Sequence, residues 1–206
     1  MSALTLGAAM RGFVGRLSPF LLVLSAAGFL GARAWLGELS RWDAAVVLGV
    51  VAAYPFLEWV IHVFVLHSRY DFDLARKHRE HHADPWRLDV VFIPWSTHAQ
   101  VLPLVVAPLF LLEGTPLRLV ISGLATLWLL GIVYEWVHYL AHVPYAAKTR
   151  WMRELQRTHR LHHFKNEHHW QGVATHLADR VLGTYPDPSS VETSPSCRSL
   201  NETPAA

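Results

Sequence analysis

The chain of 206 residues has the length of one domain, and its formal net charge of +2 gives no sign of a nucleic-acid-binding surface. Hydrophobic residues make up 52% and charged residues only 17%, an apolar balance that is unusual for a soluble domain of this length. The single cysteine, Cys197, excludes a disulfide framework and a cysteine-based zinc finger. The chain holds fourteen histidines, and these are the first candidates for chemistry.

Four apolar runs without a charged residue follow one another along the chain, at 17–32, 44–57, 90–112 and 119–134. A helix needs about 20 mostly apolar residues to cross the core of a bilayer, and each run reaches that length with its flanking residues. The alternative is four buried helices of a soluble protein, but too little polar sequence remains to cover them. We therefore expect four membrane helices, the first of them retained rather than cleaved as a signal peptide.

Short connections pair these helices into two hairpins. Residues 33–43 join the first two runs, and the Gly-Thr-Pro break at 114–116 separates the last two. The expected fold class is all-α, an integral membrane protein with about four transmembrane helices in two hairpins and a cytoplasmic histidine-rich helical cap. The expected parts are an N-terminal cytoplasmic segment (1–16), a membrane domain (17–185) and a disordered tail (186–206) that is rich in Pro, Ser and Thr.

The placement of lysine and arginine predicts the orientation of the chain, because cytoplasmic segments of membrane proteins carry an excess of both. The segments outside the two hairpins hold most of them: Arg11, Arg16, Arg69, Arg76, Lys77, Arg79, Arg87, Lys148, Arg150, Arg153, Arg157, Arg160 and Lys165. The hairpin connections hold only Arg33, Arg41 and Arg118. Both termini and both histidine-rich segments are therefore predicted to face the cytoplasm.

One histidine motif occurs twice. The sequence RKHREHH stands at 76–82 and RTHRLHH at 157–163, and each follows an apolar helix that carries Glu-Trp-Val, at 58–60 and at 135–137. After each Glu-Trp-Val comes a pair of histidines. The chain is thus an internal pseudo-repeat, in which a membrane hairpin ends in a histidine pair and a basic segment adds HxxHH. Two equivalent ligand sets suggest two metal ions, or one site built symmetrically.

The spacing of these histidines suits metal ligands, because residues i, i+3 and i+4 share one face of a helix. The candidate ligands are ten: His62, His67, His78, His81, His82, His138, His142, His159, His162 and His163. His62 and His67 are five residues apart, which on an ideal helix puts them on different sides. That pair requires either a distorted helix end or two different metal ions. The remaining histidines, His98, His168, His169 and His176, are read as ordinary surface or capped residues.

Ten nitrogen ligands are too many for one ion, and two ions with about five ligands each leave one open position per ion if each is six-coordinate. Imidazole ligands suit zinc, iron, copper and nickel. Iron in such an open site can change its oxidation state and activate dioxygen, whereas zinc would indicate hydrolysis or a structural role. Zinc could occupy the same ligands in a purified or crystallised form. For Glu58 and Glu135 we favour a supporting role, accepting a ring N–H and fixing the ligand tautomer. Direct ligation by either carboxylate is the alternative.

In this order around two membrane hairpins, HVFVLH, HREHH, HYLAH and HRLHH resemble the histidine boxes of the fatty acid hydroxylase superfamily. These membrane di-iron proteins include sterol desaturases, fatty acid hydroxylases and carotene hydroxylases. The stretch HRLHHFKNEHHWQGVATHLADRVLGTYPD also looks like the family's ending. The resemblance covers about 55–187. It implies that the same ten histidines are the ligands of two iron ions, the expected cofactor, with 17–185 as the hydroxylase domain.

The implied activity is that of an oxidoreductase that hydroxylates, or desaturates, an unactivated C–H bond of a lipid such as a fatty acyl chain, using dioxygen and external electrons. A sterol or carotenoid substrate is the alternative within the superfamily, and a membrane metal-binding or transport protein is the alternative of another class. The expected partners are the membrane, a lipid substrate and a separate electron donor, either a b-type cytochrome or a ferredoxin with its reductase. Apolar walls near the histidines are expected from Phe56, Phe64, Leu66, Trp136, Tyr139 and Leu140.

Overall fold

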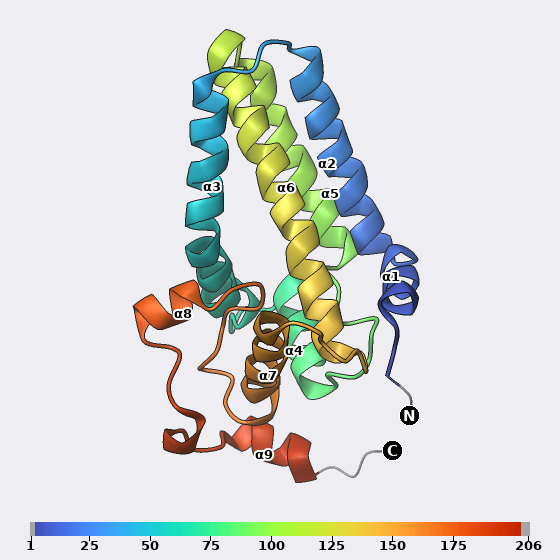
Figure 1. Cartoon of the computed structure of the whole chain (residues 1–206), viewed down its shortest axis with the longest axis vertical. Coiled ribbons are helices and arrows are strands. Elements are labelled where there is room, and N and C mark those ends of the chain that lie inside the picture. Colours follow the sequence, from blue (N-terminus) through green and yellow to red (C-terminus); the bar gives the residue numbers. More distant parts are fainter. Residues whose placement is uncertain (1–2, 203–206) are drawn as a thin grey trace.

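The computed structural model describes residues 3–202. The regular elements of this part of the chain are helices, apart from one bridge between Leu4 and Tyr145, and loops connect them. Long helices stand side by side, and short helices gather at one end of them, where both ends of the chain also lie (Figure 1). Three helical segments are long and apolar enough to cross a membrane: Leu17–Trp35 (α2), Arg41–Leu66 (α3 and η1) and Gly114–His142 (α6). The predicted all-helical class is confirmed.

The third predicted run is shorter in the structure than in the sequence. Of residues 90–112, only Trp95–Leu111 forms an apolar helix, made of α5 (Trp95–Val106) and a 3₁₀ turn, η2 (Ala107–Leu111). The start of the run leaves the helix because Pro94 disfavours helical geometry just before it, and because the Ile93 amide donates to Glu135 Oε1 at 2.8 Å. The expected four membrane helices are therefore three long helices and one shorter one.

The turn between α2 and α3 ties three helices together at the end far from the histidines. Gly37 takes a positive φ of 68° there, and Ser40 caps α3 in a capping box with Asp43. The Asp43 carboxylate lies 2.8 Å from the Arg33 guanidinium of α2 and accepts a hydrogen bond from Ser122 of α6. Each charge is buried beside its partner, as a low-dielectric setting requires.

Helix α6 is the centre of the bundle, and it packs against α2 on one side and α3 on the other (Figure 1). Trp128 of α6 meets Phe29 of α2 edge to face, with ring centroids 5.0 Å apart. On the outside of the bundle, large apolar side chains such as Leu24, Leu48 and Leu104 are more than half exposed. An exposed apolar surface on this scale is stable where lipid, not water, surrounds it.

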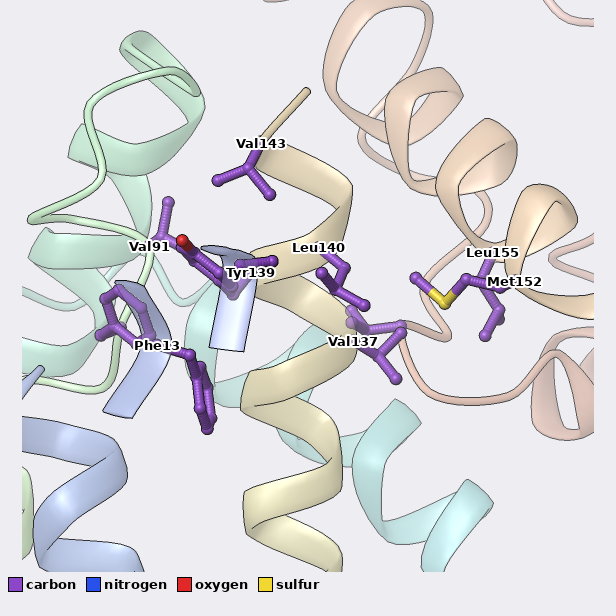
Figure 2. Close-up of a cluster of buried hydrophobic side chains, with 11 residues drawn as sticks. Phe13, Val91, Val137, Tyr139, Leu140, Val143, Met152 and Leu155 are labelled. Atoms are coloured by element: carbon purple, nitrogen blue, oxygen red, sulfur yellow. The ribbon is translucent and has the colours of Figure 1, made fainter. Parts of the chain in front are cut away.

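A second core lies at the histidine end and joins the membrane helices to the cap. Figure 2 shows Phe13 of α1 (Leu6–Val14) beside Tyr139 of α6, while Met152 and Leu155 of α7 (Arg150–Phe164) approach Leu140 from another side. All five side chains are buried. The last turns of α6 are therefore held from several directions, and this is the part of α6 that carries two of the candidate ligands.

The helices at the histidine end form a cap, which consists of α7, α4 (Asp73–Ala83) and α8 (Leu177–Leu182). Two short helices follow the cap: η3 (Pro188–Ser190) and α9 (Pro195–Glu202). These two helices lie within 186–206, the segment predicted to be a disordered tail, of which 203–206 lie outside the described residues. The Ser194 amide donates to the Lys165 carbonyl at 2.9 Å, and the buried Cys197 thiol contacts the His163 carbonyl at 3.1 Å. Both acceptors lie at the carboxyl end of α7, outside the tail.

Candidate metal centre

All ten predicted ligands converge at the histidine end of the bundle, in two groups of five. The first histidine cluster is His62, His67, His78, His82 and His162, and the second is His81, His138, His142, His159 and His163. Within each cluster the candidate ligand atoms all lie within 4.8 Å of one another. The arrangement is consistent with a site for two metal ions.

Each HxxHH motif divides its histidines between the two clusters. On α4, His78 and His82 belong to the first cluster, whereas His81 belongs to the second. On α7, His159 and His163 belong to the second cluster and His162 to the first, so the two halves exchange one ligand each. The reason lies in the helix period. Positions i and i+4 differ by about 40° around the axis, but i+3 and i+4 differ by about 100°. The expectation that all three share one face was too coarse, because α4 and α7 both run between the clusters.

The two histidines of HVFVLH are brought together by a π-helix. Residues Ile61–Leu66 (η1) extend α3 with wider turns, and the His67 amide donates to the His62 carbonyl at 3.1 Å. An i→i+5 hydrogen bond stacks residues that are five apart, which an α-helix would turn away from each other. Of the two possibilities that the spacing left open, the distorted helix end is the one observed.

The ring nitrogens are placed as a cation would require. His142 Nε2 lies 2.8 Å from His159 Nε2 in the second cluster, and His67 Nε2 lies 3.2 Å from His162 Nε2 in the first. Two ligands at a right angle and about 2.1 Å from one ion would be about 3.0 Å apart. His162 also points Nδ1 at the His169 carbonyl, at 2.9 Å. A neutral ring that donates from Nδ1 has a lone pair on Nε2. Lone pairs this close repel unless a positive ion lies between them, so the residues fit a metal ion.

Backbone carbonyls of two loops orient the ligand rings. His62 Nδ1 lies 2.5 Å from the Gln171 carbonyl, and the rings of His138 and His142 make hydrogen bonds to the backbone of Val91 and Pro85. The first loop, residues 84–94, follows the HxxHH motif of α4 and contacts His138 and His142 of the second half. The second loop, residues 165–176, follows the HxxHH motif of α7 and contacts His62 of the first half. Such contacts set which nitrogen carries the proton and so which nitrogen can bind a metal.

The two carboxylates hold these loops instead of the rings. Glu58 Oε1 accepts hydrogen bonds from the amides of Val173 and Ala174, and Glu135 Oε1 accepts from the Ile93 amide and from the Ser18 hydroxyl. Neither glutamate belongs to a histidine cluster among the described residues. We expected each carboxylate to accept a hydrogen bond from a histidine ring N–H. Instead, each carboxylate accepts from backbone amides of the loop whose carbonyl groups contact the histidine rings. The two glutamates therefore act on the ligand rings indirectly, through the loop backbone.

Burial keeps the cap histidines in the form that binds metals. Removal from water, and secondly the neighbouring imidazoles, hold the pKa values of His81, His159 and His163 well below the ordinary histidine value. These rings are therefore neutral at neutral pH. A neutral imidazole is what metal binding needs, because a protonated ring has no free lone pair.

Asp179 and Gly172 shape the second loop, and sequence reasoning gave neither a role. The Asp179 carboxylate accepts hydrogen bonds from the amides of Gln171 and Gly172 and from the Thr184 hydroxyl. A Cβ on Gly172 would lie 1.9 Å from the Thr175 carbonyl oxygen, so only glycine fits there. The Asp-Arg-Val-x-Gly-Thr ending noted in the sequence was the available signal.

Among the described residues, four histidines lie outside both clusters. His98 pairs with the Ser18 hydroxyl at 2.8 Å, and the His169 carbonyl serves as an acceptor. The side chain of His168 is largely exposed, and His176 lies 3.3 Å from Thr158. None of them adds a candidate ligand.

A cleft leads from the histidines into the membrane helices. Its volume is about 370 Å³, and it is lined mostly by apolar side chains of α3, η1, α6 and the segment 90–94, with His78 and His138 at one end. One histidine of each cluster therefore borders the cleft. Of the six expected wall residues only Leu66 lines it. Phe56 and Phe64 are exposed on the outside of α3 and η1, and the residues of α6 pack into the core of Figure 2.

Comparisons with known proteins agree with this geometry. The model of the fatty acid hydroxylase family matches residues 47–184. The dihydroceramide fatty acyl 2-hydroxylase FAH2 of Arabidopsis thaliana is 29% identical over 154 residues, which are 68% of this chain and 62% of that protein. The chain thus spans less than two thirds of that relative's length. A solved structure described as full-length scs7p, with only the hydroxylase domain visible, superimposes with a TM-score of 0.65 at 20% identity. The superposition covers 86% of this chain and 68% of the solved chain, and it supports the fold.

The family match extends over well more than half of the chain and includes both HxxHH motifs and both histidine pairs. The family recognised from those motifs is thereby confirmed. The chain belongs to the fatty acid hydroxylase family.

Proposed function

We propose that the chain is a membrane-bound di-iron oxygenase that hydroxylates an unactivated C–H bond of a lipid, most simply a fatty acyl chain. The ten clustered histidines would hold two iron ions, five ligands to each. One observation carries the proposal: an apolar cleft within the membrane helices ends beside His78 of the first cluster and His138 of the second. A hydrocarbon chain in that cleft would present a C–H bond to both ions.

The chemistry of the metal pair, when bound, is the activation of dioxygen with two external electrons, which leaves one oxygen atom in the substrate. The residues of the chain have other tasks. The carbonyls of Gln171 and His169 orient His62 and His162 through Nδ1, and Glu58 holds the backbone that follows these carbonyls. The apolar lining of the cleft keeps water from the reacting C–H bond.

Three features support a lipid substrate at a membrane surface. The candidate spans end at the histidine clusters, the cleft is lined mainly by hydrocarbon, and a relative is named as a fatty acyl 2-hydroxylase. The excess of lysine and arginine in the cap supports a cytoplasmic position for both clusters and both termini. Electrons would come from a separate donor, a b-type cytochrome or a ferredoxin with its reductase.

The test is lipid mass spectrometry of cells with and without the protein, grown under isotopically heavy dioxygen. The expected product is a lipid heavier by one oxygen atom, with that atom derived from dioxygen. His162→Ala should abolish the product and lower the iron content, while the matched variant His168→Ala, on an exposed ring outside both clusters, should change neither. An oxygen atom that came from water, or full turnover by His162→Ala, would refute the proposal.

A further inference from the structure

The cleft follows one face of α6 away from the histidines. Its lining residues on that helix include His138, Tyr134, Gly131 and Trp128, each three or four positions from the next. His138 lies ten positions after Trp128, which at a rise of 1.5 Å per residue is about 15 Å. The cleft therefore reaches deep into the candidate membrane span Gly114–His142.

The far end of the cleft is lined by side chains that pack against neighbouring helices. The Trp128 ring packs edge to face on Phe29 at 5.0 Å, and Leu22 of α2 lines the cleft beside it. Gly131 lies between this end and the histidines, and a Cβ on it would be 3.6 Å from Leu22 Cδ2. At Gly131 the wall thus has no side chain, and the space reaches Trp128.

We infer that Gly131 and Trp128 determine how long a hydrocarbon tail can lie beyond the oxidised carbon, with the methyl end of the tail against Trp128. This inference rests on the proposed function, and it adds the direction and the length of the bound chain. Leu22, Leu127 and Trp128 make the far end apolar, so a polar headgroup there would lose its hydration without a partner.

The polar end of the lipid therefore belongs at the opposite end, where Lys77 and His78 line the cleft. An extended chain advances roughly 1.2 Å per bond, as three backbone bonds of a polypeptide span about 3.3–3.6 Å. A depth of about 15 Å thus holds about 12 bonds of tail between His138 and Trp128.

Two substitutions should move the preferred tail length in opposite directions. Gly131→Leu places a side chain across the cleft, whereas Trp128→Ala removes the ring that closes it. Membranes that contain each variant would be supplied with perdeuterated fatty acids of graded length, and oxygenated products counted by mass spectrometry. Gly131→Leu should lower the ratio of long-tail to short-tail product by roughly tenfold or more, and Trp128→Ala should raise it.

The matched control is Gly28→Leu, since Gly28 of α2 has open space around its Cα and does not line the cleft. It should leave the ratio of products unchanged. Shifts in the same direction for both cleft variants, or no shift in either, would overturn the inference and mean that the tail stays in the bilayer.

A second measurement needs no turnover. A fatty acid with a photoreactive diazirine at its methyl end would be cross-linked to the protein in membranes, and the labelled peptides identified. Label on Leu22, Leu127 or Trp128 in the unaltered protein, lost in Gly131→Leu, supports the inference. Label confined to exposed positions such as Leu104, or unchanged in Gly131→Leu, overturns it. If the cross-links appear as expected but no oxygen is inserted, the proposed function fails while the binding mode stands.

Discussion

Replacing His78 and His81 together should remove both metal ions, although the two residues are neighbours on one helix. His78 belongs to the first cluster and His81 to the second. Replacing His78 and His162 together should remove only the first ion, although these residues come from helices α4 and α7. Metal loss should thus follow the clusters and not the position of a histidine in the sequence.

The magnitude follows from the number of ligands. A metal site with four protein ligands contributes about 10–16 kcal/mol in favourable cases, or about 3 kcal/mol for each ligand. Loss of one ligand should therefore weaken binding of that ion by about two orders of magnitude. The other ion keeps all five of its histidines and should keep its affinity within about threefold, a change of less than 1 kcal/mol.

The assay is metal content by elemental analysis after anaerobic loading with ferrous iron and passage over a weak chelator. We expect about two ions per chain in the unaltered protein, one in His78→Ala, one in His78→Ala/His162→Ala and none in His78→Ala/His81→Ala. His168→Ala, outside the clusters, is the control. If the His78/His81 double variant kept one ion, as the His78/His162 variant should, the crossed arrangement of ligands would be wrong.

Three further predictions concern the support of the site. Glu58→Ala leaves the amides of Val173 and Ala174 without their acceptor and should lower metal affinity about 10–100-fold. Glu58→Gln keeps an acceptor oxygen and should retain most of the metal affinity. Titration with a chelator compares the two variants. Leu155→Ala empties a fully buried position and should lower the free energy of unfolding by about 2–5 kcal/mol in mixed-micelle denaturation, and equal stability of the variant would contradict the packing. Burial lowers the pKa of His176 to about 4 in the folded chain. Between pH 6.5 and about 4, the His176 ring is therefore protonated in the unfolded chain but neutral in the folded chain, which favours unfolding. Stability should therefore be full above pH 6.5 and fall towards pH 4, and His176→Gln should flatten this fall; an unchanged pH profile in the variant would refute the assignment.

Local patterns predicted the helical class and the ten histidines, because both depend on neighbours in the sequence. Uncharged runs of membrane length and the HxxHH spacing are visible without any tertiary contact. The same local reasoning placed His78, His81 and His82 on one face, and the structure separates His81 from the other two. A shift of one residue along a helix turns the side chain by about 100°, and this turn decides which ion the ring can reach.

Other expectations failed where the partner lies far along the chain. Glu58 meets Val173 and Glu135 meets Ile93, whereas sequence proximity had suggested nearby rings. Of the aromatic and apolar residues expected to wall the site, only Leu66 does so, since the sequence cannot tell a face toward the cleft from a face toward lipid.

The apolar runs and the repeated histidine motifs are enough to predict a helical membrane protein with two sets of five histidines, because hydrophobic length and helical spacing are properties of short segments. Tertiary structure alone decided how α4 and α7 share their rings between two clusters, which loops orient them, and that a cleft along α6 ends beside both. Those features arise from packing between helices that are tens of residues apart, and no local pattern records which of their faces will meet.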